Sequence, residues 1–442
     1  MATSLNQARH NKVHTHEGAP VIKVGAHEEL TRTVCSCLLF EKTFYESGQS
    51  VADRIRGLVP RCDPLFVADT AIRARNEMKL RHVPLLLARE LAREPKSRNL
   101  LVSLLPNIIN RADELAEFMA IYWSEGRSPV AYAVRRGLGA AFNKFDEYQF
   151  AKYNRDKDIK LRDVLRVVHP VPKDDAQSAI FKKLKEGTLA TPDTWEVALS
   201  ACSDKSAEWT RLLKEHKLGA MALLRNLRNM GEANVDRALV REELANARTD
   251  KILPFRFISA ADHNPHLEDV LETMMLKNLE GIKKLPGKTV LLSDVSWSMD
   301  DKLSAKSTMK RDDAASGIAV ITRELCEEVE IYAFGNNIYA VPNRRGFALR
   351  ERLKAKQEGT KLGQAVEYIQ KNVPCDRIIV FTDEQTQDRI PNAAKGVKGY
   401  IVNVAANQNG VGYDGGWVHV HGWSESVMRY ISEYEDLGSK DA

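Results

Sequence analysis

The sequence predicts a long α-helical array followed by a doubly wound α/β domain. Helical spacing of apolar residues recurs in window after window through the first 280 or so residues. After residue 286, short apolar runs alternate with helical windows, which is typical of a mostly parallel sheet. The chain has 442 residues, 43% of them hydrophobic and 28% charged, so it is globular and long enough for more than one domain. We place the division at Pro286, giving residues 1–286 and 287–442.

The first part consists of helices joined by short loops. The expected helices cover 26–46, 63–78, 82–94, 112–125, 129–153, 176–186, 192–200, 205–217, 220–229, 236–247 and 265–283. Asp63 and Pro64 are typical of an N-cap and the first residue of a helix. No repeat of fixed period is found, so a stacked helical array is predicted from the succession of helices alone.

The second part alternates strands and helices. The expected strands are 289–294, 329–334, 377–382 and 399–404, and the expected helices are 312–327, 362–372 and 424–434. Strands this apolar are buried on both faces, as in a parallel sheet covered by helices. In that architecture, binding sites form just beyond the carboxyl ends of the strands.

Oxygen-bearing side chains stand at these strand ends. Asp294, Ser296 and Ser298 follow the first strand, Thr360 stands in the loop before helix 362–372, and Asp383 follows strand 377–382. Two carboxylates and three hydroxyls suit a hard cation and leave a coordination position open. We therefore predict a site for Mg²⁺, with Mn²⁺ and Ca²⁺ as alternatives. The competing interpretation is that Asp294 caps a helix and the serines occupy a polar loop.

The order DVSWS, then GT, then FTDEQ resembles the metal-ion-dependent adhesion site (MIDAS) of von Willebrand factor A domains. The resemblance covers roughly residues 287–442. It implies that the five residues just named are the metal ligands, supplied by three loops. The segment 300–313 lengthens the first of these loops and brings Asp300 and Asp301 close to the site.

Charge is distributed unevenly along the chain. Residues 1–286 carry 45 Lys and Arg against 38 Asp and Glu, whereas residues 287–442 carry 20 against 22. A mildly basic first part permits a polyanionic partner without requiring one. The windows 73–98 and 135–173 are locally basic, and the second is interleaved with aromatic residues that could stack on bases. The pattern alone favours the alternative that the aromatics are core and the cations are solvated.

Individual basic residues can be placed on the expected helices. Lys144 and Lys152 are eight residues apart on helix 129–153, which allows them a common side. Pro170 makes His169 a helix end, where the helix dipole favours a cation.

Four segments resemble the TROVE module of the Ro autoantigen family: AIRARNEMKLRHVP (71–84), AKYNRDKDIKLRDVLRVVHPVPKD (151–174), MALLRNLRNM (221–230) and LPFRFISA (253–260). In that family a von Willebrand A domain follows the module. The resemblance implies a ring of HEAT-like helical repeats closed by the A domain. It also implies a basic hole that takes single-stranded 3′ ends of misfolded RNA, and an outer face that binds small noncoding Y RNAs.

The resemblance places Lys152 and His169 on the RNA surface of the family, and Lys79, Arg81 and His82 match it by motif. The candidate RNA-binding residues are Lys152, His169, Lys144, Arg166, Lys79, Arg81 and Arg136.

We therefore predict an RNA-binding ribonucleoprotein component that acts in RNA quality control or stress response and is not an enzyme. Its partners would be small noncoding RNA, single-stranded RNA 3′ ends, and an exoribonuclease or another protein at the A domain. The alternative is a metal-dependent protein-interaction adaptor without RNA. A third hypothesis is a hydrolase. Against it, Ser296 occupies the position where aspartyl-nucleophile phosphatases have a second Asp, and the sequence contains no P-loop and no nucleophile elbow.

The sequence also predicts a location. No run of 18 apolar residues is present, the start of the chain has no apolar signal region, and the six cysteines form no CxxC pair. We expect a reduced, cytoplasmic setting with neither membrane nor DNA as partner.

Overall fold

The computed structural model describes residues 25–35, 48–154, 156–249, 252–302, 309–383, 386–404 and 416–421, together with 427, 428, 431, 432 and 435. The helices before the sheet are α1 (Ala26–Cys35), α2 (Gly48–Leu58), α3 (Pro64–Asn76), α4 (His82–Arg93), α5 (Leu101–Ile108), α6 (Asp113–Tyr122), α7 (Tyr132–Phe142), α8 (Glu147–Tyr153), α9 (Leu161–Val168), α10 (Asp175–Glu186), α11 (Trp195–Ala201), α12 (Lys205–Lys214), α13 (Ala220–Glu232), α14 (Arg237–Asn246), α15 (Phe255–His263) and α16 (Glu268–Leu279).

The second part contains β1 (Leu285–Asp294), α17 (Arg311–Glu324), β2 (Cys326–Phe334), β3 (Ile338–Val341), α18 (Gly346–Leu353), α19 (Leu362–Asn372), β4 (Arg377–Thr382), β5 (Lys398–Asn403) and β6 (Trp417–His421). The predicted division at Pro286 falls inside β1. The expected segments 36–46 and most of 424–434 lie outside the described residues, although those described within 427–432 are helical.

The expected start of α3 is confirmed, because the Asp63 carboxylate accepts the Phe66 N–H at 2.9 Å and Pro64 is the first residue. The prediction of one continuous helix over 129–153 is wrong. Asp146 and Gln149 form a capping box that begins the new helix α8. The intervening Phe145 is buried, so the break turns the chain back onto the core.

The sheet has the strand order β3-β2-β1-β4-β5-β6, with β3 antiparallel to β2 and the other pairs parallel. β1 lies between β2 and β4, so its carboxyl end stands beside that of β4. In the register, Leu291 pairs with Ile331 on β2 and with Ile379 on β4. This pairing brings the loops after β1 and β4 to one edge.

Alternate side chains along the strands lie on opposite faces of the sheet and pack into two different hydrophobic cores. Leu291 and Ile379 pack with α17 and with the main core of the helical part. Val290 and Leu292 point to the other face and pack with residues of α19, such as Val366. Burial on both faces explains the unbroken apolar runs of these strands.

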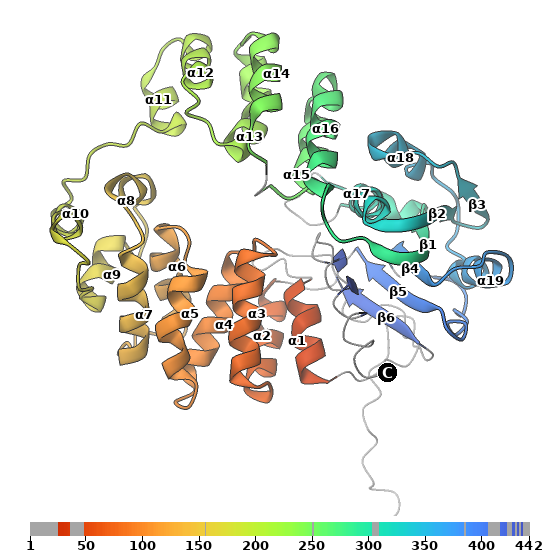
Figure 1. Cartoon of the computed structure of the whole chain (residues 1–442), viewed down its shortest axis with the longest axis horizontal. Helices are drawn as coiled ribbons and strands as arrows, with labels where there is room; N and C mark the ends of the chain where they lie inside the picture. The colour runs from red at the N-terminus through yellow and green to blue at the C-terminus, as the bar shows by residue number, and fades with distance from the viewer. Residues whose placement is uncertain are drawn as a thin grey trace, which may run out of the picture.

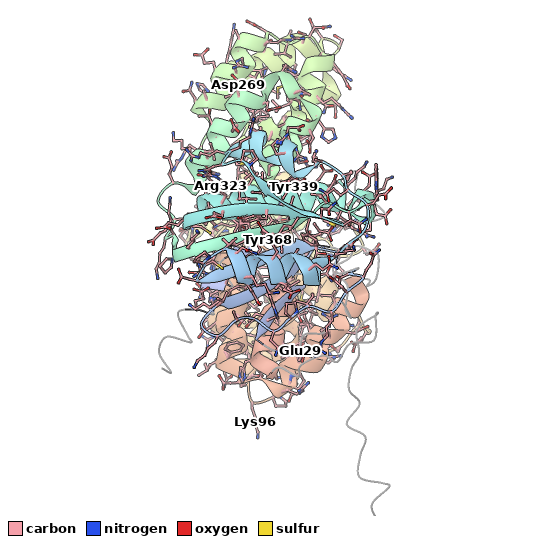
Figure 2. The ribbon with its side chains drawn as sticks, turned by 90° about the vertical axis from the view of Figure 1, so that its right-hand side faces the viewer. Glu29, Lys96, Asp269, Arg323, Tyr339 and Tyr368 are labelled. Atoms are coloured by element: carbon pink, nitrogen blue, oxygen red, sulfur yellow. The ribbon has the colours of Figure 1, made fainter. Side chains whose placement is uncertain are left out.

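The helices curve into a ring that the sheet domain closes (Figure 1). At one end α15 and α16 contact α17 and α18, and at the other end α1 contacts β6. Seen from the side, the sheet lies between the helix that carries Asp269 and the helix that carries Glu29 (Figure 2). Where α15 meets α17, a Cβ on Gly317 would lie 2.4 Å from the ring of Phe255. The predicted helical ring closed by a doubly wound domain is thus confirmed. Among the described residues, no helix combines the length and the apolar character needed to cross a bilayer.

Candidate metal and nucleic-acid sites

The loops after β1 and β4 bring the predicted metal ligands to one edge of the sheet. Asp294 is 1% exposed and Asp383 is 0% exposed. The Asp294 carboxylate accepts the Ser296 N–H at 2.9 Å and the Thr382 hydroxyl at 2.6 Å. The hydroxyls of Ser296 and Ser298 are 3.0 Å apart. These bonds fix the first loop with its oxygen atoms gathered at the strand ends.

Thr360 is buried in the loop next to them. Residue 357 pairs with Ser296 in an isolated β-bridge, which lays this loop along the first one. The Thr360 carbonyl accepts the Gln387 N–H at 2.9 Å and the Thr386 hydroxyl at 3.2 Å, which connects it to the loop after β4. Three loops therefore meet where the sequence places the five oxygen ligands.

The site fits a divalent cation in its charge and its donor atoms. Burial, together with the adjacent Asp383 carboxylate, raises the pKa of Asp294. Two buried carboxylates side by side repel each other, and a cation between them would relieve that repulsion. Every donor is oxygen, which suits Mg²⁺ or Mn²⁺. One positive group of the chain is also present, because the Arg311 guanidinium donates to the Asp383 carboxylate at 2.7 Å.

The predicted RNA-binding cations lie in different parts of the helical array, and two groups of them have partners within the protein. The Lys144 ammonium donates to the carbonyls of Pro106 at 2.5 Å and Ile109 at 2.6 Å, so it satisfies the end of α5. Burial lowers the pKa of Lys144. Lys144 is thus exposed but held against the end of α5. It lies between α7 and α8, so it does not share one helix with Lys152, on which the predicted common side depended.

The cluster before α4 is also paired. Arg81 donates to Glu117 at 2.7 Å and to Asp113 at 3.1 Å. Lys79 has a left-handed backbone with φ 59° and donates to the carbonyl of Asn76. The acids of α6 therefore neutralise the charge of Arg81, whereas the charge of Lys79 is held by a backbone carbonyl.

Around α8 the phenylalanines and tyrosines have separate roles. Phe142 and Phe150 are wholly buried, as the interpretation of the aromatics as core requires. Tyr148 is 46% exposed, and the Lys152 ammonium lies 5.7 Å from the centre of its ring and 5.8 Å from that of Tyr153. Lys152 thus stands in a partly exposed aromatic setting of the kind that can stack a base.

His169 ends α9, as predicted. It adopts a left-handed backbone with φ 49°, and its N–H donates to the Leu165 carbonyl at 3.0 Å. The side chains of His169 and Arg166 are exposed. Arg136 on α7 is exposed as well, with its guanidinium 5.9 Å from the centre of the Tyr132 ring. These three residues remain predictions for RNA contact.

A cationic cavity that the sequence reasoning did not identify lies between α13 and α15. Its volume is about 310 Å³, and its lining includes Arg225, Arg228, Arg256 and His263 but no acidic residue. Among the described residues, neither Arg225 nor Arg256 takes part in an ion pair, whereas Arg228 pairs with Glu232 at 3.4 Å. The signal was present as arginines three residues apart on one face of a helix whose other face is apolar. We call this site the α13–α15 cavity.

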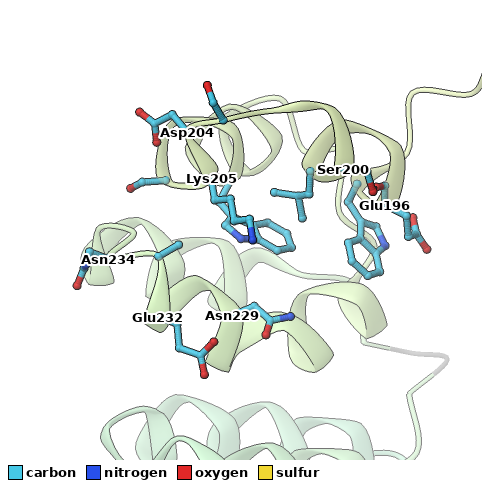
Figure 3. Close-up of a pocket in the computed structure, with 13 residues that line it drawn as sticks. Glu196, Ser200, Asp204, Lys205, Asn229, Glu232 and Asn234 are labelled. Carbon is cyan, nitrogen blue, oxygen red and sulfur yellow. The ribbon is translucent and has the colours of Figure 1, made fainter.

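A second cavity, of about 850 Å³, lies among α11, α12 and α13 and has the opposite charge. Figure 3 shows its lining, with Glu196, Asp204 and Glu232 around Lys205. Trp195 and Trp209 also line the cavity and stack on each other with ring centres 6.0 Å apart. Its excess of acids disfavours phosphate, so the two neighbouring cavities differ in the ligands that they can accept.

Comparison with known proteins gives a family match and a fold match. Residues 182–328 match the model of the TROVE domain, a stretch that contains the whole α13–α15 cavity. The chain superposes on the crystal structure of the Deinococcus radiodurans RO (RSR) protein with a TM-score of 0.66. That match has 20% sequence identity and covers 93% of this chain and 99% of the other.

Curated relatives match over a short stretch. The chain is 34% identical over 91 residues to telomerase protein component 1 of Mus musculus, which is 19% of this chain and 4% of that protein. It is 31% identical over 110 residues to telomerase protein component 1 of Rattus norvegicus, again 4% of that protein. The likeness to these much longer proteins therefore concerns a small part of each.

Proposed function

Since this chain carries a TROVE domain within the fold of a Ro protein, we propose that it binds RNA and acts by binding rather than by catalysis. The α13–α15 cavity carries the proposal, because it gathers three arginines and a histidine without an acid inside the matched domain. Guanidinium groups bind phosphate through paired N–H donors. A single-stranded backbone threaded along the ring would meet this cavity on α13 and α15.

The finer proposal concerns the RNA and its setting. We infer that the ligand is small noncoding RNA, held on the helical array, together with single-stranded 3′ ends. The role would lie in RNA quality control or stress response in the cytoplasm. Within the described part of the chain, Cys62, Cys202, Cys326 and Cys375 are free thiols, which agrees with a reducing compartment.

We expect loss of two cavity arginines to weaken RNA binding. The double variant Arg225→Gln and Arg256→Gln should bind a single-stranded RNA oligonucleotide less tightly than the wild type. Each lost phosphate contact should lower the slope of log affinity against log salt by about one. Fluorescence anisotropy across a salt series measures both quantities. The matched control is Lys371→Gln, which removes an exposed cation from α19 of the sheet domain.

The same measurement tests the residues predicted from the sequence. Lys152→Ala and His169→Ala should each weaken RNA binding, whereas Asp294→Ala should not, because the positive excess lies in the helical part. Equal affinity and equal salt slope in the wild type and all cavity and surface variants would show that these positions do not contact RNA, and a wild type that binds no RNA would remove RNA from the proposed function. An adaptor that binds a basic peptide through the acidic cavity of Figure 3 would then be favoured.

We also propose that the sheet domain binds one divalent cation, Mg²⁺ or Mn²⁺. Asp294, Ser296, Ser298, Thr360 and Asp383 would hold it, and its open position would take an oxygen of a protein partner. Asp294→Ala should abolish Mn²⁺ binding in isothermal titration calorimetry while circular dichroism shows the fold retained. Equal Mn²⁺ binding by the wild type and this variant would contradict the assignment.

A further inference from the structure

Arg311 reaches the candidate metal site although it belongs to no part of the D-x-S-x-S, Thr, Asp pattern. It is the first residue of α17 and is 0% exposed. Its guanidinium donates to the Asp383 carboxylate at 2.7 Å and to the Ser298 carbonyl at 3.1 Å. The Arg311 side chain thus contacts two of the three loops that would hold a cation, the loop after β1 and the loop after β4.

The loop between β1 and α17 holds this arginine in place. The Arg311 N–H donates to the Asp301 carbonyl at 3.0 Å, and the guanidinium lies 3.3 Å from the Asp301 carboxylate. Asp300 is paired with Lys310 at 2.9 Å, and this hydrogen bond lowers the pKa of Asp300. The two acids of the lengthened loop are therefore paired with Lys310 and Arg311 at the start of α17.

The charge of the guanidinium changes what the site offers to a metal ion. Arginine stays protonated in proteins, so Arg311 contributes a permanent positive charge. With Asp294 and Asp383 ionised, the three side chains carry a net charge of about −1 instead of −2. A divalent cation would have to share or take the Asp383 oxygen that Arg311 holds, against repulsion that is strong where water is excluded.

We propose that Arg311 is a tethered counter-cation of this site. It neutralises Asp383 when no metal is bound, which keeps the three loops folded, and it lowers the affinity of the site for divalent cations. When a metal ion binds, the guanidinium releases Asp383 and keeps its pairing with Asp301. This inference rests on the proposed metal site and adds a competitor for that site from within the chain.

The test measures Mn²⁺ binding by the full-length protein with Arg311→Met, a neutral side chain of similar length. Isothermal titration calorimetry should show Mn²⁺ bound at least about tenfold more tightly by this variant than by the wild type, since the repulsion is gone. Arg311→Lys keeps a cation and should stay near the wild-type affinity. Arg323→Met removes another arginine of α17, one that pairs with Glu324 and does not contact these loops, and should leave Mn²⁺ affinity unchanged.

The melting temperature is a second measurement that is independent of the calorimetric Mn²⁺ titration. In EDTA, Arg311→Met should melt below the wild type, because Asp383 loses its ion pair with Arg311 while it stays buried beside Asp294. Mn²⁺ should restore much of that loss, and it should raise the melting temperature of the wild type by less than that of the variant at the same concentration, because the wild type binds it more weakly.

The outcomes separate this inference from the metal assignment. If wild type and Arg311→Met bind Mn²⁺ equally, or if Mn²⁺ leaves the melting temperature of the variant unchanged although it binds, the counter-cation role is wrong and the metal site stands. If Mn²⁺ binds to neither protein and shifts neither melting temperature, the metal site is wrong and the inference is overturned with it.

Discussion

Replacing Glu435 by Gln is expected to lower the free energy of unfolding by about 3 kcal/mol, because it leaves a buried guanidinium without its counter-charge. Arg377, the first residue of β4, is 1% exposed, and its Nε and Nη2 each donate to the Glu435 carboxylate at 2.5 Å. Lys398 at 2.8 Å and Tyr400 at 3.0 Å donate to the same carboxylate. Glu435 therefore joins the end of the chain to two strands of the sheet.

Urea denaturation followed by circular dichroism measures this loss. The control is the double variant Arg377→Met with Glu435→Leu, which removes both charges and should be less destabilised than Glu435→Gln alone. A single variant as stable as the wild type would show that the ion pair does not hold the sheet.

The same pair makes stability depend on pH. Although burial alone would raise it, hydrogen bonds from Arg377 and Lys398 lower the pKa of Glu435. The contribution of the carboxylate is therefore present above the pKa of an unfolded glutamate and is lost as the pH falls through the lower folded value. The wild type should lose more stability on acidification than Glu435→Gln.

Arg350→Met is expected to loosen the helical part from the sheet domain and to destabilise the protein by about 2–3 kcal/mol. Arg350 on α18 is 4% exposed and donates to Asp262 on α15 at 2.9 Å and to Asp313 on α17 at 2.8 Å. The effect should be below that of Glu435→Gln. Asp313 keeps Lys354 at 2.9 Å, and the Asp262 side chain is partly exposed.

Calorimetric unfolding distinguishes local loosening from global loss. The wild type should unfold in a transition that includes both parts, and Arg350→Met should separate or broaden it, because α15 no longer holds α17 and α18 through charge. The matched control is Arg352→Met, an exposed arginine on the same helix. Identical melting profiles for both variants would place the connection between the parts elsewhere, for example in the packing of Phe255 on Gly317.

The sequence determined the two-part architecture, because each part has its own period of apolar residues. The runs 377–382 and 362–372 coincide with β4 and α19. The order of Asp294, Thr360 and Asp383 along the chain also predicted three loops at one sheet edge, since parallel strands end on the same side. Asp63 with Pro64 and Pro170 after His169 marked helix ends because their effects on the backbone are local.

Only the tertiary structure showed which cationic side chains are available to bind RNA and which are paired within the protein. Lys144 and Arg81 look like surface cations in the sequence, yet their partners are carbonyls or acids that lie more than 30 residues away along the chain. The same is true of Arg311, which reaches Asp383 across 72 residues. The α13–α15 cavity likewise exists only once two helices lie side by side. The spacing of apolar residues can be recognised within a short stretch of sequence. The pairing of charges depends on distances between segments that are far apart in the sequence, and these distances are set by packing.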